Sequence, residues 1–121
     1  MPIKIDAENK GQIIQRRLFN QPFSDLEKGI DFRVKRQSLI SSNIANINTP
    51  NYRAFDLIMN EKLKDPKLVP TATPIKDDGN SVDLDLEMTK ITENQLMFSA
   101  LSQMLSRRFE QLRSVIAEGR R

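Results

Sequence analysis

The chain has 121 residues, a formal net charge of +3 and an apolar share of 38%, which suits one small domain or a pair of long elements. It contains no His and no Cys, which excludes a disulfide scaffold, a thiol nucleophile, a Ser-His-Asp triad and the usual kind of zinc site. No apolar run approaches the roughly 20 residues that span a bilayer, and residues 1–11 lack the apolar core of a cleaved secretory signal. We therefore expect a helical interaction protein that has no catalytic residue, metal, cofactor or small-molecule substrate.

The charges are distributed unevenly along the chain. Residues 77–87 hold five carboxylates and no cation, whereas residues 107–121 hold five arginines and two glutamates. Because anions favour the N-terminus of a helix and cations its C-terminus, this polarity favours one long helix between the two blocks. A basic nucleic-acid-binding surface is the alternative, although only one aromatic residue, Phe109, lies within the basic block.

Four segments follow from the patterning. Residues 1–21 form a polar lead with a short amphipathic stretch, residues 22–50 form a first helix, residues 51–81 form a loop-rich middle, and residues 82–121 form a second, longer helix. In the first helix, Ser24 and Glu27 match a capping box that predicts its start, and Pro50 predicts its end because the residue before a proline disfavours the α region. Its apolar positions are Leu26, Ile30, Ile40, Ile44 and Ile47.

The second helix carries the strongest periodic signal. Steps of four and three residues from Leu84 meet apolar side chains at eight of ten positions, and a second apolar row runs beside them. The middle segment contains three prolines between residues 66 and 74, which suits extended, irregular chain. These patterns predict an all-α fold in which the two long helices form an antiparallel coiled-coil-like hairpin joined by a short irregular segment.

The longer helix would extend beyond the first helix, and its remaining apolar face would be exposed to solvent in a monomer. Exposed apolar surface of this size usually marks a binding surface, so we predict packing between subunits; an ordinary intramolecular core is the alternative. The predicted helix-packing and interface residues are Leu26, Ile30, Ile40, Ile47, Leu84, Met88, Ile91, Met97, Phe98, Leu101, Met104, Leu105, Phe109, Leu112 and Ile116. A helical adaptor or chaperone-like protein with one dedicated partner would share this pattern, but would form a discrete 1:1 complex instead of a polymer.

The end of the first helix is rich in asparagine. Asn and Ser bond nearby backbone and so suit a helix end and the loop after it, and Asn51 can adopt a left-handed conformation at tolerable cost. A simple C-terminal cap would account for these residues. However, they also match a signature, with residues Ser42, Asn43, Ile44, Ala45 and Asn46 followed by Thr49, Pro50, Asn51 and Tyr52.

This signature resembles that of the flagellar axial proteins (rod, hook and hook-associated subunits), in which Gly is usual at position 51. The second half of the chain, with residues 79–84, 87–88 and 93–95, looks similar to the proximal rod subunits of the basal body within that family. The short middle agrees with this resemblance, because distal rod and hook proteins carry large inserts. The likeness spans roughly residues 18–116.

The resemblance implies a structural role in the bacterial flagellum and in motility. The terminal helices would pair in the inner tube of a self-assembling hollow rod, and the partners would be other copies of the chain, other rod subunits, the membrane-ring protein FliF and the adaptor FliE. The family further implies passage through the flagellar type III export apparatus without a cleaved signal peptide, to a periplasmic place in the basal body. It implies no nucleic-acid partner.

Overall fold

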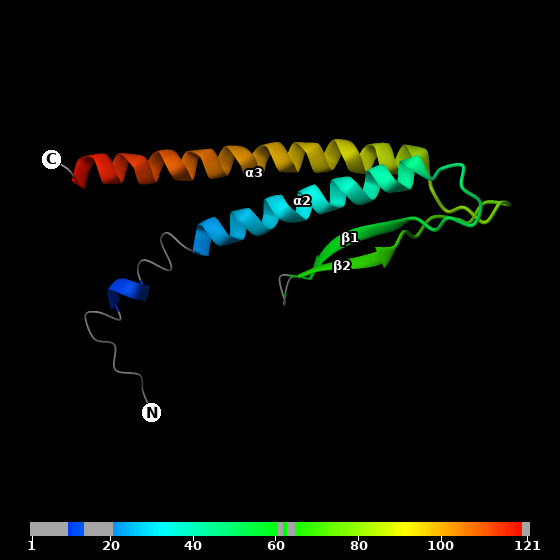
Figure 1. Ribbon diagram of the computed structural model, residues 1–121, viewed down its shortest axis with the longest axis horizontal. Coiled ribbons are helices and arrows are strands. Elements are labelled where there is room, and N and C mark those ends of the chain that lie inside the picture. The colour runs from blue at the N-terminus through cyan, green and yellow to red at the C-terminus, as the bar shows by residue number, and fades with distance from the viewer. Residues whose placement is uncertain (1–9, 14–20, 61, 63–64, 120–121) are drawn as a thin grey trace, which may run out of the picture.

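The structure, a computed structural model, describes residues 10–13, 21–60, 62 and 65–119. In chain order its elements are α2 (Gln21–Ala45), β1 (Phe55–Asn60), β2 (Asp65–Pro70) and α3 (Leu84–Gly119). Figure 1 shows α2 between α3 on one side and the two strands on the other, with α3 extending beyond the start of α2. Of the predicted lead, residues 1–21, only 10–13 and 21 are among the described residues.

The predicted fold class is wrong. The segment between the helices contains an antiparallel two-stranded sheet, so the chain is mostly helical rather than all-α. The predicted coiled-coil-like hairpin of helices also fails, because 38 residues (46–83) that include this sheet join α2 to α3, and because the residues of α3 that are buried are polar and not an apolar heptad seam.

The strands tolerate the prolines that suggested irregular chain. Pro70 lies opposite Phe55 and Pro66 opposite Met59, while the N–H of Thr71 bonds the carbonyl of Ala54 in the adjoining pair. In an antiparallel ladder this alternation turns the nitrogens of Pro66 and Pro70 away from β1, where no ladder hydrogen bond is needed. The two prolines therefore fit an edge strand and deny its outer edge to another strand.

The start of α2 also differs from the prediction. The helix begins at Gln21, so Ser24 lies inside its first turn rather than at a cap. Phe23 is likewise within the helix, and its ring lies 5.2 Å from the ring of Phe109, centroid to centroid. A proline is favoured in a first turn because it carries no N–H that would need a partner there, which explains how the helix passes position 22.

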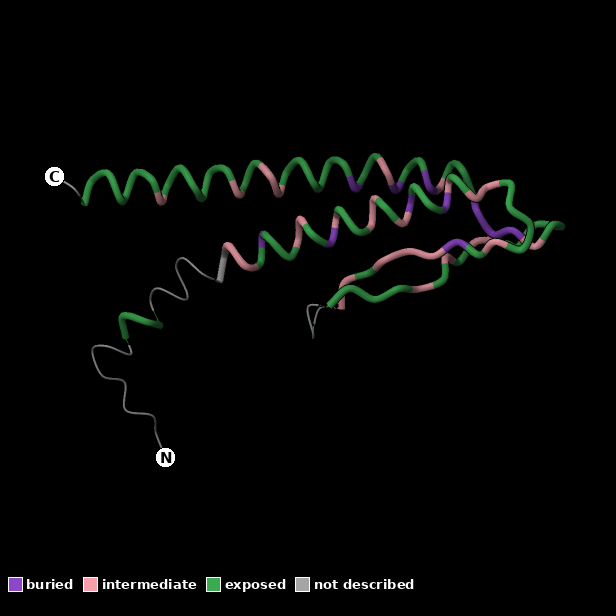
Figure 2. The backbone as a smooth tube through the Cα atoms, in the orientation of Figure 1, coloured by how far each residue is buried: buried purple, intermediate pink, exposed green. Residues whose placement is uncertain are grey.

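The buried core is small and lies along the contacts of α2 with α3 and β1. Its apolar members are Leu26, Phe32, Ile40, Ala54 and Val82. Six polar residues are buried with them: Asn43, Asn80, Ser81, Glu87, Lys90 and Asn94. Figure 2 shows this buried part concentrated where α2, α3 and the connecting loops meet, while most of α3 is exposed. Polar contacts therefore define the centre of the fold.

Candidate functional site

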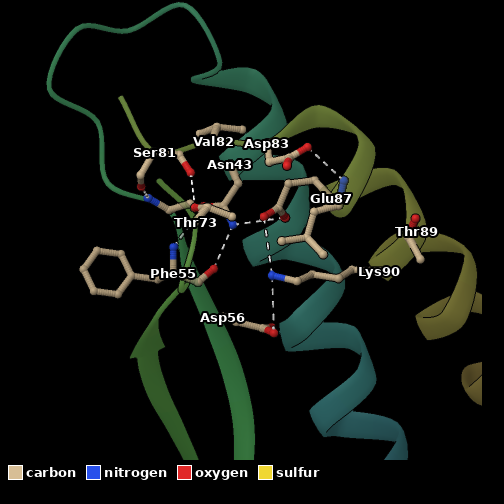
Figure 3. A network of polar contacts seen from close by, with 12 residues as sticks. Asn43, Phe55, Asp56, Thr73, Ser81, Val82, Asp83, Glu87, Thr89 and Lys90 are labelled. Carbon is tan, nitrogen blue, oxygen red and sulfur yellow. Dashed lines mark hydrogen bonds and ion pairs between the residues drawn. The ribbon is translucent and has the colours of Figure 1, made fainter. Parts of the chain in front are cut away.

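The Asn-rich signature forms a hydrogen-bonded junction centred on Asn43. This side chain is fully buried on the last turns of α2. Its Nδ2 donates to the carbonyl of Phe55 at 2.7 Å and to Glu87 Oε2 at 3.2 Å. Its Oδ1 accepts from the hydroxyl of Tyr52 at 3.0 Å and from the N–H of Phe55 at 3.5 Å. Asn43 thus uses both donors and its acceptor to join α2, β1 and α3 (Figure 3).

A second asparagine, Asn80, holds the turn after α2. Its Nδ2 donates to the carbonyls of Asn46 and Thr49, both at 2.8 Å, and its Oδ1 accepts from the N–H of Val82 at 2.7 Å. These carbonyls lie at a helix end, where acceptors without an intrahelical partner need one. Within the turn, Thr49 donates to Asn46 Oδ1 at 3.1 Å. The signature and residue 80 therefore form one capping unit.

Asn51 adopts the left-handed conformation that the sequence suggested. Its φ is +64°, and it is the one non-glycine residue with positive φ among those the structure describes. Its N–H donates to the carbonyl of Asp78 at 2.9 Å, and its side chain lies against Gly79, which also has positive φ. The usual Gly of the signature and the Asn found here both suit this conformation.

A cluster of charges lies beside the Asn43 junction. Arg36 donates to both oxygens of Asp56, at 3.0 and 3.2 Å, and Lys90 Nζ lies 3.5 Å from Asp56 Oδ2 and 3.5 Å from Glu87 Oε1. Burial by itself would raise the pKa of Asp56, but the hydrogen bonds from Arg36 and from the N–H of Leu57, together with the nearby cations, lower it below its ordinary value. The cluster ties β1 to both helices.

The contact between α2 and α3 continues through Asn94. Its Nδ2 donates to the carbonyl of Arg33 at 2.8 Å and to Gln37 Oε1 at 3.2 Å, and its Oδ1 lies 3.5 Å from Arg33 NH1. Burial lowers the pKa of Arg33, the charge of Arg36 lowers it further, and Glu93 opposes both effects. The three buried residues of α3 are Glu87, Lys90 and Asn94, which we call the polar stripe.

The apolar row of α3 lies partly outside this contact and partly in it, since the ring of Phe109 packs on Phe23 of α2. We call its members the apolar stripe: Leu84, Met88, Ile91, Phe98, Leu105, Phe109, Leu112 and Ile116. Met88 is 51% exposed and Phe109 57%, while Ile91, Leu105 and Leu112 are half-buried. The adjacent row is also open, with Met97 and Met104 exposed and Leu101 half-buried against Gly29. On α2, by contrast, Leu26 and Ile40 are buried and Ile30 is half-buried, and Ile47 is half-buried in the turn that follows α2.

Sequence reasoning missed the polar stripe and the capping role of Asn80. Glu87 belongs to the acidic block (residues 77–87), which was expected only to favour a helix N-terminus, yet its side chain is fully buried. Asp77, Asp78, Asp83 and Asp85 are exposed, as that interpretation required. The spacing of Glu87, Lys90 and Asn94 at helical intervals was the available signal, because residues three and four apart share a helix face.

The described part of the chain offers no catalytic constellation. No group of three or more Asp, Glu, His or Cys side chains in residues 10–13, 21–60, 62 and 65–119 could hold a metal ion. Among these residues, no helix is both long and apolar enough to cross a membrane. The arrangement instead provides a polar junction inside and apolar surface outside.

Comparison with known proteins bears on this arrangement directly. The family model described as flagella basal body rod protein matches residues 33–53, the second half of α2 and the signature turn. The flagellar basal body rod protein FlgB of Bacillus subtilis (strain 168) is 28% identical over 127 residues, covering 85% of this chain and 98% of the relative. The chain is thus similar, over most of its length, to a flagellar basal body rod protein.

Other relatives show the same similarity. FlgB of Borrelia hermsii is 26% identical over 120 residues, covering 72% of this chain and 89% of the relative. FlgB of Escherichia coli (strain K12) is 26% identical over 125 residues, with coverage of 77% and 91%. The similarity extends well beyond the 21 residues of the family match (33–53) and includes the proximal rod likeness seen in the second half of the sequence.

Proposed function

We propose that the chain is a structural subunit of the proximal rod of the flagellar basal body, where it assembles with other rod subunits. The similarity to FlgB over most of the chain carries this assignment. The structure supports a structural role, because α3 exposes a long apolar surface while a polar junction holds the subunit together. The family is one of structural proteins and is not known for enzymatic activity.

The apolar stripe of α3 is the surface that we assign to contacts between subunits. Its exposed members are Leu84, Met88, Phe98, Phe109 and Ile116, and Met97 and Met104 are exposed in the adjacent row. Burial of apolar area stabilises association by about 25 cal/mol per Å² before the cost of ordering is subtracted. The methionines of this face have flexible side chains that adapt to neighbours of different shape, which suits a surface shared by several kinds of rod subunit.

The predicted interface set divides in the structure. Leu26 and Ile40 are buried inside the subunit, where they contribute to its own core. Ile30 and Ile47 are half-buried. The proposal therefore assigns contacts between subunits chiefly to α3, and the helix packing within the subunit to α2.

We further propose that the subunit occupies the periplasmic base of the rod, reached through the flagellar type III export apparatus, and contacts the membrane-ring protein FliF and the adaptor FliE. The resemblance to proximal rod subunits is what supports this position. Crosslinking from residues of the apolar stripe in isolated basal bodies, followed by mass spectrometry, would identify the neighbours directly.

Deletion of the gene tests the proposed function. We expect loss of motility and basal bodies that retain the membrane ring but lack a rod, with both restored by the gene in trans. Motile cells with complete rods would contradict the assignment. A discrete 1:1 complex with a single protein, found in place of rod material, would instead favour the adaptor hypothesis.

A further inference from the structure

The charges near the two ends of α3 are only partly explained by the helix macrodipole. Arg107 and Arg108 lie about three turns before the end of α3, and its last turn contains no basic residue. At the other end, Asp77 and Asp78 lie more than one turn before Leu84, where the helix begins. The macrodipole acts only within the first and last turns, so these four charges need another explanation.

The two arginines flank two other side chains on one side of α3. Because successive residues are about 100° apart around a helix, Met104 and Gln111 lie between Arg107 and Arg108 when α3 is viewed along its axis. These four residues line a shallow hollow of about 250 Å³, which we call the basic patch. All four are exposed, and no ion pair among the described residues involves either arginine.

A turn before α3 carries charges of the opposite sign. Residues 75–78, which we call the acidic tip, have the sequence Ile-Lys-Asp-Asp and are all exposed. The N–H of Gly79 donates to the carbonyl of Lys76 at 2.9 Å, and the N–H of Lys76 donates to the carbonyl of Asn80 at 2.8 Å. Ile75 is 59% exposed. A turn that is already held by its backbone loses little conformational entropy when it binds.

The basic patch and the acidic tip are complementary, but they cannot meet within one subunit. Each has an exposed apolar side chain beside two charges of one sign. From Leu84 to Arg107 the helix rises about 35 Å. Figure 1 shows the loops that precede α3 at one end of the molecule and the C-terminal turns of α3 at the other. The tip that fits the patch is therefore available only from a second copy of the chain.

We infer that the acidic tip of one copy docks on the basic patch of a second copy. The two carboxylates face the two arginines, and Ile75 covers Met104. The inference deepens the proposed function and rests on it for the choice of a second copy as the partner. Exposed ion pairs are individually weak, so the apolar contact contributes as well. Because the two surfaces differ, the contact is heterologous and continues from copy to copy in one direction.

The sequence has no Cys, so single cysteines on the isolated full-length chain test the contact. One variant carries Pro74→Cys beside the tip, activated as a mixed disulfide with thionitrobenzoate. The second variant carries Gln111→Cys in the patch, and its thiol displaces thionitrobenzoate to form a disulfide between the two chains. The released dye gives the rate, which is divided by the rate of the same thiol with a small disulfide. Both substitutions leave every charge in place.

Gln95→Cys is the matched control for the patch variant. It is the same substitution at an exposed residue of α3, about 24 Å from Gln111 along the helix. At low ionic strength we expect the thiol at position 111 to react with the tip variant at least about fivefold faster than the thiol at position 95. The difference should shrink in about 1 M salt, because exposed charges are then screened.

Charge reversal gives the decisive comparison. Asp77→Arg in the tip variant, or Arg107→Glu in the patch variant, should each lower the rate about fivefold. When the two reversed variants are combined, opposite charges face each other again, and the rate should return to within about twofold of the original. Both residues are exposed, so the helicity measured by circular dichroism should not change.

Three results would overturn the inference. One is an equal rate for the thiols at positions 111 and 95. Another is a charge-swapped pair that remains as slow as the single reversals, whether or not a reversal lowers helicity. The third is equal rates together with sedimentation of the chain on phosphatidylglycerol vesicles, lost with Arg107→Glu, since the patch would then bind an anionic membrane. These tests use neither cells nor rods, so their failure is distinguishable from a negative gene-deletion result.

Discussion

Asn80 Nδ2 donates to the carbonyl of Asn46 at 2.8 Å, across 34 positions of sequence. This bond joins the segment that precedes α3 to the turn that follows α2. The same nitrogen bonds the carbonyl of Thr49, and Asn80 is fully buried. The turn that carries the signature is therefore held in place by a residue that lies outside the turn. Its conformation depends on a residue that precedes the second helix.

Substitution of Asn80 tests this dependence. Asn80→Ala removes three hydrogen bonds and leaves two carbonyls and the N–H of Val82 without that partner. Because buried polar groups without partners are costly, we expect the free energy of unfolding to fall by about 2–4 kcal/mol. Urea denaturation followed by circular dichroism measures the change. Asn48→Ala, at an exposed residue of the same turn, is the control and should have little effect.

The backbone conformation of Asn51 predicts different effects of two substitutions on stability. Since its φ is +64°, Asn51→Gly should leave stability within about 0.5 kcal/mol, whereas Asn51→Val should lower it by about 1–2 kcal/mol. The β-branched side chain is strained in this region, and glycine is not. Urea midpoints of the two variants provide the comparison, and equal stability of the Val and Gly variants would show that the left-handed conformation is not maintained in solution.

The ion pair between Arg36 and Asp56 predicts a specific dependence on pH. Because the pKa of Asp56 is lowered in the folded chain, the charged carboxylate stabilises the fold fully above about pH 4, and this stabilisation is lost as the pH falls through the lowered pKa. Asp56→Asn should therefore cost about 2–3 kcal/mol at pH 6 and much less near pH 2. Unfolding free energies at the two pH values give the difference.

The exposed carboxylate Asp77 supplies the matched control for this measurement. Asp77→Asn should change stability by less than about 0.5 kcal/mol at either pH, because the side chain is solvated. If Asp56→Asn has the same effect at pH 6 and at pH 2, the charge of Asp56 is not the source of its contribution, and the contact with Arg36 acts through shape or packing alone.

Much of the fold could be predicted from the sequence where the signal is local. The left-handed conformation of Asn51 and the extent of α3 follow from asparagine and periodicity, whereas α2 ends at Ala45, five residues before the Pro50 that predicted its end. The two strands could not be predicted in the same way, because Pro66 and Pro70 argue against a strand unless their nitrogens face outward. That condition depends on the register with β1, which is a tertiary property.

Of the candidate site, the apolar positions could be predicted from the sequence, but their orientation could not. The apolar stripe is visible as a periodic row, but which face of α3 meets α2 depends on Asn43, Arg36 and Asp56, which lie on other elements. Hydrophobic periodicity favours the apolar face as the inner one, and the structure places Glu87 there. Near the start of α3 the directional bonds of buried polar groups select the inner face, and a pattern of apolar positions does not contain them.

The exposed apolar stripe leads to the last prediction, which separates assembly from folding. Met88 is 51% exposed, so Met88→Lys should change the unfolding free energy of the isolated chain by less than about 0.5 kcal/mol. In the rod, a charge buried in an apolar contact without a partner is costly, so we expect loss of swimming in soft agar and few complete rods in isolated basal bodies. Gln103→Lys introduces the same charge at an exposed residue off the stripe and should leave motility intact. Normal motility with Met88→Lys at wild-type protein levels would remove Met88 from the contact surface, whereas unfolding of the isolated variant would show that Met88 supports the subunit itself.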